Sequence, residues 1–285
     1  MASGLGGAST PVRVATLHNS IEDVHPVARP LLSYSFRVQT HCLAASPVLK
    51  IDLLHLGVAQ DRVSVLPNGV SLAKCDPREV AAQLAALRIS PDAPVVVFPI
   101  RFLGKPGQAV DIVKAVQRAA PDAVVVVAGI AVNQDVEDRL REGLLGESVA
   151  FPGSPVVFTG FVKDLRTIFA ASSVVAAPSP PRSLPLTLLE AMSEGAAVVS
   201  GDKGEIGDLI MDGVTGRLLI GPSAEDVAGV IGGLLTNGKE RERLGAAGRE
   251  RVASEYSDRA SVKRLEALYD ELIQQTFGGE ARASV

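Results

Sequence analysis

The sequence predicts an α/β protein whose parallel sheet is covered by helices on both faces. Short valine-rich runs alternate with amphipathic stretches along most of the 285 residues. The runs, such as Val124 to Val132, are continuously apolar, which is typical of strands buried on both faces of a sheet. Alternation of strand and helix at this spacing indicates a doubly wound arrangement. With 47% apolar residues, the chain can build a sizeable core in one large domain or two ordinary ones.

Each element is expected where its pattern is clearest. The expected strands are Val12–Leu17, His41–Ala45, Val63–Leu66, Val95–Ile100, Ala123–Ala128, Val156–Thr159, Val174–Ala177 and Ala196–Ser200. The expected helices between them are Ala109–Ala119, Val136–Leu144, Leu165–Ala171, Leu186–Glu194, Glu205–Met211 and Ala224–Leu235.

The turn signal Pro67-Asn68-Gly69 predicts a hinge between a short first segment and a complete second domain. We therefore expect a partial N-terminal segment at residues 1–70, a complete domain at 71–255, and a C-terminal helix with a frayed tail at 256–285. The last part is charged and helical, and it needs an apolar surface to lie on. Its apolar face is formed by Val262, Leu265, Leu268, Tyr269 and Leu272.

Charge and cysteine content argue against several classes of function. The formal net charge of −4 lacks the excess of positive charge that is typical of proteins that bind nucleic acid or an anionic membrane surface. Cys42 and Cys75 have no paired spacing, so free thiols in a reducing cytoplasm are expected. The N-terminal MASGLGGAST lacks the basic start and apolar core of a signal peptide, and the longest apolar runs are too short to span a bilayer. No cluster of Asp and His demands a metal, so neither a metal nor a resident cofactor is expected.

Ligands of open α/β sheets bind at the carboxyl ends of the strands, so polar residues that follow strands are the site candidates. Arg101 and Lys105 follow the strand that ends at Ile100. Pro185 stands where a helix begins, and the free amides of Leu186 and Thr187 would face an anion there. Two cations and one helix start suit a diphosphate.

Glu190, one turn beyond Leu186, faces either the same cleft or solvent. In the cleft, its carboxylate suits the vicinal hydroxyls of a sugar. Taken singly, each of these residues is more simply a surface charge, and only their joint placement at strand ends favours a binding site.

The order of several segments then resembles one known family. The segments are VSVLPNGV, VVVFPIRFLGKPGQAVDIVKAV, AVVVVAG, VVFTGFVKDLRTIFAASSVVAAPS and LLEAMSEGAAVVSGDKGEIGDLIMDGVTGRLL. This order resembles the retaining glycosyltransferases of family 4, which have the GT-B fold. The match runs from about Arg62 to Leu235. It implies one complete Rossmann-like donor domain, a partial N-terminal Rossmann-like segment, and a C-terminal helix that packs back on that segment.

The resemblance also implies roles for individual residues. Arg101 and Lys105 would bind the diphosphate of a nucleotide sugar, and Glu190 of LEAM would hold the ribose. The backbone of Phe161 and Val162 would lie against the base. VATLHNS resembles the acceptor-domain strand whose histidine lies beside the reacting sugar, which maps to His18.

Three departures from the family pattern qualify this assignment. The family carries two glutamates eight positions apart, and Arg182 stands at the first of these positions, which contacts the donor sugar. Ile100 replaces the usual glycine before the strand-end arginine. The strands and glycine-rich loop that normally precede VATLHNS are absent from the sequence, so a truncated acceptor domain is expected.

Two hypotheses follow. The first is a glycosyltransferase, or its donor-binding subunit, that transfers sugar with retention and needs a partner chain for the missing acceptor half, unless the chain is a fragment. The alternative is a non-catalytic, regulatory protein of the same fold, which Arg182 and the short N-terminus favour. Three interpretations of Arg182 stay open: a surface residue, a partner of Glu190 or another carboxylate, or a contact to a donor that carries a carboxylate or extra phosphate.

Overall fold

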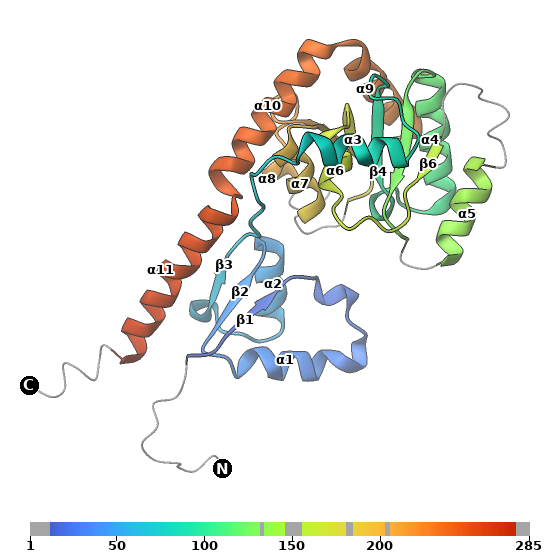
Figure 1. The fold of residues 1–285 in the computed structure, drawn as a ribbon. Coiled ribbons are helices and arrows are strands. Elements are labelled where there is room, and N and C mark those ends of the chain that lie inside the picture. The colour runs from blue at the N-terminus through green and yellow to red at the C-terminus, as the bar shows by residue number, and fades with distance from the viewer. Residues whose placement is uncertain (1–11, 132–133, 146–155, 181–184, 203–205, 278–285) are drawn as a thin grey trace, which may run out of the picture. The chain divides into compact units, whose positions relative to one another are not determined.

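The computed structural model describes residues 12–131, 134–145, 156–180, 185–202 and 206–277 (Figure 1). The chain divides into two compact units. The first contains the residues up to Asn68 together with those from Arg259 onward, and the second runs from Gly69 to Asp258.

The first unit is a small parallel sheet with the strand order β1-β2-β3. Ser46 is the N-cap residue of its α2 helix, and the Ser46 hydroxyl accepts a hydrogen bond from the amide of Leu49. Leu49 and Leu53 of α2 are fully buried in one cluster with Cys42. The elements are β1 (Val14–Leu17), the 3-10 turns η1 (Ile21–Asp23) and η2 (Pro26–Ala28), α1 (Arg29–Arg37), β2 (His41–Ala44), α2 (Pro47–His55), η3 (Gln60–Arg62), β3 (Val63–Val65) and α11 (Asp258–Phe277).

The second unit is a parallel sheet of six strands in the order β6-β5-β4-β7-β8-β9. Its first strand, β4, lies in the middle, with β5 on one side and β7 on the other. The elements are α3 (Pro77–Ala86), β4 (Val95–Pro99), η4 (Ile100–Phe102), α4 (Pro106–Ala119), β5 (Val124–Ala128), α5 (Gln134–Leu145), β6 (Val156–Phe158), α6 (Arg166–Ala170), β7 (Val174–Ala177), α7 (Leu186–Glu194), β8 (Ala197–Gly201), α8 (Ile206–Leu209), β9 (Arg217–Leu219), α9 (Ala224–Thr236) and α10 (Gly238–Glu255).

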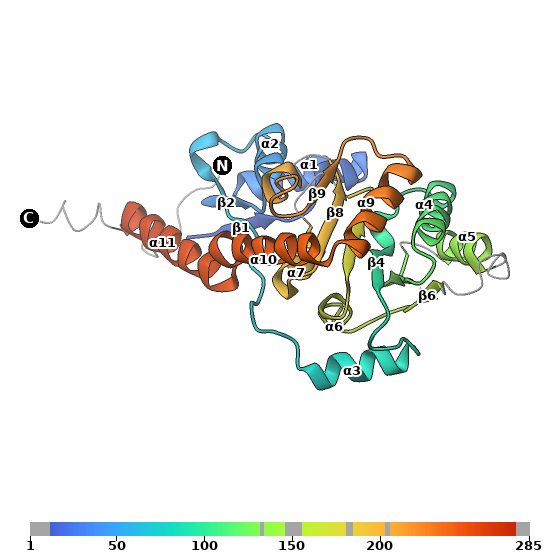
Figure 2. The same ribbon diagram turned by 90° about the horizontal axis from the view of Figure 1, so that it is seen from above.

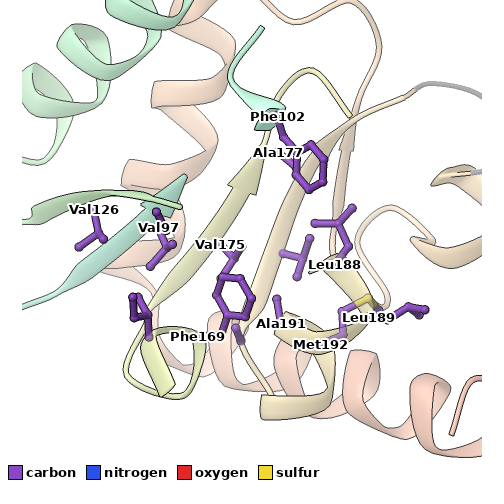
Figure 3. Packing of buried hydrophobic residues seen from close by; sticks show 14 of the residues in the cluster. Val97, Phe102, Val126, Phe169, Val175, Ala177, Leu188, Leu189, Ala191 and Met192 are labelled. Carbon is purple, nitrogen blue, oxygen red and sulfur yellow. The ribbon is translucent and has the colours of Figure 1, made fainter. Parts of the chain in front are cut away.

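Successive residues of the central strands supply two cores, because side chains alternate between the faces of a sheet. Val97 and Val175 belong to the core that also contains Phe169 and Leu188 (Figure 3). Val96 belongs to the other core, beneath α4 and α9, which lie against each other (Figure 2). The expected α/β class with its parallel sheet covered on both faces is confirmed.

The element boundaries differ from the expected ones in a few places. All eight expected strands are present, but the strand expected to reach Ile100 ends at Pro99, because Ile100 opens a 3-10 turn. The sequence pattern did not predict β9, α1, α2 or α3. No helix in the described ranges is long and apolar enough to cross a bilayer.

Candidate functional site

The candidate site lies where the carboxyl ends of β4 and β7 part, since the connections from these neighbouring strands lead to opposite faces of the sheet. Such a switch point is where open α/β sheets bind ligands. Three turns there use glycines with positive φ, namely Gly104 (φ 90), Gly129 (φ 94) and Gly160 (φ 61). Gly129 and Gly160 form an antiparallel bridge that joins the turns after β5 and β6. The Thr159 hydroxyl accepts from the Gly129 amide at 3.0 Å and strengthens this link.

These turns enclose a cavity of about 240 Å³. It is lined by Pro99, Ile100, Arg101, Phe102, Ala128, Gly129, Ile130, Phe161, Val162, Leu165 and Thr187. Its lining is mostly apolar, and two large apolar side chains in it stay open to solvent: Phe161 is 77% exposed and Ile130 is 53% exposed. Apolar walls with a few convergent polar groups are typical of a small-molecule site.

Two unpaired cations lie on the turn after β4. Arg101 lines the cavity, and Lys105 is the N-cap residue of α4. Both side chains are exposed, and neither has a hydrogen bond or ion pair within the described part of the chain. Their charges are therefore free for an anionic ligand.

The start of α7 adds free amides. Pro185 is the N-cap residue and makes no side-chain cap, while its carbonyl accepts from the amides of Leu188 and Leu189. The amides of Leu186 and Thr187 precede the first intrahelical donors, so they have no intrahelical acceptor. Thr187 also lines the cavity, which places this helix start beside it. A helix start without a side-chain cap is suited to an anion.

Glu190 lies one turn further along α7 and is half-buried. Its carboxylate makes no hydrogen bond or ion pair with the described residues. Burial raises the pKa of Glu190, the Asp164 charge raises it further, and the Arg166 charge opposes both.

An ion pair next to Glu190 was not foreseen from the sequence. Arg166, at the start of α6, donates to the Glu194 carboxylate at the end of α7 through its Nε at 2.8 Å and also through Nη2. The side chains are 15% and 2% exposed. No sequence pattern indicated this pair, because its two residues lie 28 positions apart on different helices.

The structure therefore brings four expected site residues, Arg101, Phe161, Val162 and Thr187, to one cavity. Leu186 and Glu190 stand on α7, and Lys105 is the N-cap residue of α4. His18 is exposed and lies in the other unit, directly after β1. Arg182 lies outside the described residues. No group of three or more His, Cys, Asp or Glu side chains that could hold a metal occurs among the residues that are described.

Comparison with known proteins places this site in a family. The family of glycosyl transferases group 1 matches residues 93–237, the stretch that contains the whole cavity lining. The chain belongs to this family. The expected enzyme class, a glycosyltransferase, is the class of the family.

Relatives of the glycosyltransferase include alpha-maltose-1-phosphate synthase of Mycobacterium tuberculosis, which is 30% identical over 274 residues. That match covers 86% of this chain and 69% of the relative. Sulfoquinovosyl transferase SQD2 of Arabidopsis thaliana is 28% identical over 82% of this chain, which spans 45% of the plant protein.

The glycosyltransferase also shares its fold with solved structures. Anabaena HepE, determined in complex with UDP, superposes with a TM-score of 0.75 at 20% identity. The superposition covers 90% of this chain and 72% of HepE. The expected GT-B-like fold is thereby confirmed.

Proposed function

We propose that this glycosyltransferase binds a nucleoside-diphosphate sugar and transfers the sugar to an acceptor with retention of configuration, as the family 4 resemblance implies. The observation that carries the proposal is an apolar cavity lined by Arg101, with Lys105 on the same turn and the α7 start, which has no side-chain cap, at its wall. Neither cation has a partner among the described residues. The base enters the cavity between Ile130 and Phe161. The diphosphate meets Arg101, Lys105 and the amides of Leu186 and Thr187.

The same groups supply the chemistry. Negative charge develops on the diphosphate as the bond to the sugar breaks, and preorganised donors stabilise that charge without reorganisation. Arg101 and Lys105 supply positive charge, so the proposed step uses no metal. Glu190 accepts hydrogen bonds from the ribose hydroxyls. For His18, the family resemblance implies a place beside the reacting sugar.

Titration calorimetry with UDP tests the diphosphate assignment. Each charged hydrogen bond is worth roughly 1.5–3 kcal/mol, so Arg101→Ala with Lys105→Ala should weaken UDP binding at least about tenfold. The matched control is Arg78→Ala with Lys239→Ala, which removes the same two charge types from exposed positions outside the cavity lining. Equal loss in both double variants would refute a specific phosphate contact.

A second candidate, a donor-binding protein without transfer activity, is favoured by one observation. Arg182 stands where the family pattern has an acidic residue. Transfer and donor hydrolysis should be assayed for the chain alone and with candidate partner chains. Turnover by the isolated chain would eliminate this candidate. Comparing neutral and uronic donors between the wild type and Arg182→Glu tests the donor-selectivity interpretation.

We also propose that transfer needs a partner chain that adds a parallel strand beside β1. In the described sheet β1 is an edge strand, and the unpaired backbone groups of such an edge can pair with a strand of another chain. On α1, Leu31 is 73% exposed and Tyr34 is 66% exposed, and such apolar surface marks an interaction site. A cavity of about 570 Å³ adjoins the same strand and is lined by Val12, Arg13, Val14, Gln39, Tyr269 and Ile273.

Co-expression with the products of neighbouring reading frames tests the partner proposal. A true partner should raise transfer activity. Leu31→Asp with Tyr34→Asp should abolish that gain while leaving UDP affinity unchanged, because the donor cavity lies in the other unit. Full activity of the purified chain on its own would refute the proposal.

A further inference from the structure

The buried Arg166–Glu194 pair connects three parts of the second unit. Arg166 directly follows Leu165, which lines the donor cavity. Its Nη2 donates to the Ala73 carbonyl as well as to Glu194, so α6, the end of α7 and the segment before α3 meet at one guanidinium. Cys75 completes this cluster, because its thiol donates to the same Glu194 oxygen at 3.6 Å.

Glu190 and Glu194 lie four residues apart on α7, so their side chains share one face of the helix. Arg166 bonds to Glu194 and acts on Glu190 only through its field. Asp164, in the loop before α6, is the other charge that acts on Glu190, and its carboxylate accepts from the backbone amide of Arg166. Glu194 thus bonds to the Arg166 guanidinium, while Asp164 and Glu190 interact with Arg166 through their charges.

We propose that Glu194 is a positioning residue that holds Arg166 at the end of α7 and thereby keeps the Glu190 carboxylate free to accept ligand hydroxyls. The inference rests on the proposed ribose contact of Glu190. A buried guanidinium without a carboxylate is strongly unfavourable. If Glu194 were neutral, the carboxylate one turn back, Glu190, would take its place. Glu190 would then have to break an ion pair before it could bind a sugar.

Two single substitutions should have opposite effects on the pH profile of UDP binding. In Glu194→Gln, Arg166 pairs with Glu190, so UDP should bind about tenfold more weakly and the acidic midpoint of binding should fall. In Arg166→Gln, Glu190 loses the one cation among the described residues that favours its charged form, so the midpoint should rise while affinity at pH 8 stays close to that of the wild type. Both variants should be less stable than the wild type. If the ion pair had only a structural role, both variants would change the UDP affinity and the midpoint in the same direction.

The experiment is calorimetric UDP titration of the full chain between pH 4 and 9, for the wild type, both single variants and the double variant Arg166→Gln with Glu194→Gln. Circular dichroism checks folding in each case. The double variant removes both charges together and should bind UDP at pH 8 within about threefold of the wild type. If Glu194→Gln does not fold, comparing the double variant with Arg166→Gln decides. Because Glu194 acts through Arg166, the two must bind UDP equally well at pH 8, and weaker binding by the double variant would overturn the inference.

The outcomes separate this inference from the proposed function. Midpoint shifts in the same direction, or unchanged UDP affinity in Glu194→Gln, would overturn the role of Glu194. Glu190→Gln in the wild-type background is the separate check, since unchanged UDP affinity there would remove the ribose contact itself. A wild-type chain that binds neither UDP nor ADP nor GDP would overturn the donor proposal before either variant is considered.

Discussion

Replacing Gly245 by alanine should destabilise the second unit, although alanine is the better helix former. Gly245 is buried in α10 where this helix crosses the end of α7. A Cβ at this position would lie 2.1 Å from the carbonyl oxygen of Gly195, whereas ordinary contacts lie at 3.4–4 Å. The two helices would therefore have to separate by more than 1 Å. The obstructing atom is backbone, in a left-handed helix cap with φ 86, so no side chain can rotate away.

The magnitude follows from two opposing effects. Gly→Ala inside a helix gains about 1 kcal/mol. Overpacking a tight contact costs about 1–3 kcal/mol, and a fixed backbone atom puts this site at the upper end of that range. The net result should be a loss of about 2 kcal/mol in the free energy of unfolding.

The matched control is Gly229→Ala in α9, because Gly229 is exposed and a Cβ there would have no neighbour within 4 Å. It should gain up to about 1 kcal/mol. Urea unfolding of the full chain, followed by far-UV circular dichroism, measures both variants. If Gly245→Ala proves as stable as Gly229→Ala, the close crossing of α7 and α10 is wrong.

Three further results are expected. Burial raises the pKa of Glu190 above its usual 4.5. The protonated side chain therefore stabilises the fold below pH 4.5, and this stabilisation is lost as the pH rises through the folded-state pKa. Glu190→Gln should therefore raise the melting temperature at pH 7, with the difference from the wild type disappearing near pH 4, as calorimetric scans would show. Burial and the Glu194 charge raise the pKa of Cys75 to about 11, so about one thiol in a thousand is ionised at pH 8. Iodoacetamide should therefore label Cys75 far faster in the unfolded chain than in the folded one. Equal labelling rates in the two states would contradict this. Leu49 is fully buried in the first unit, so Leu49→Ala should lower the free energy of unfolding by about 2–5 kcal/mol, as thermal or urea unfolding would measure. UDP affinity should stay unchanged, because Leu49 lies outside the unit that contains the candidate cavity.

The sequence predicted those features that depend on local pattern. Continuous valine runs marked the buried strands, and the helical repeat that stops at Gly195 gave the bounds of α7, since glycine adopts the left-handed cap at no steric cost. β9 was missed because its three residues are only partly buried and carry no distinctive pattern. α1 was missed because its sequence RPLLSYSFR has apolar residues on two faces, one of them exposed.

The candidate site was predictable where residues follow strands directly, as Arg101 does. The cavity wall contributed by Ile130 and Leu165 was not predicted, because it depends on how turns from separate strands meet. The Arg166–Glu194 pair joins residues 28 positions apart, and neither residue type signals a buried charge. Only the packing of α6 against α7 brings that pair together.

The donor cavity draws every lining residue from the unit between Gly69 and Asp258. Under the proposed function, substitutions in the cavity lining can change donor choice without disturbing the β1–β3 sheet, and substitutions in that sheet can change acceptor choice without altering how the nucleotide is held. Recombination at the connection near Asn68 would exchange one specificity and keep the other. Under the proposed function, donor and acceptor preferences would thus be separately inheritable traits.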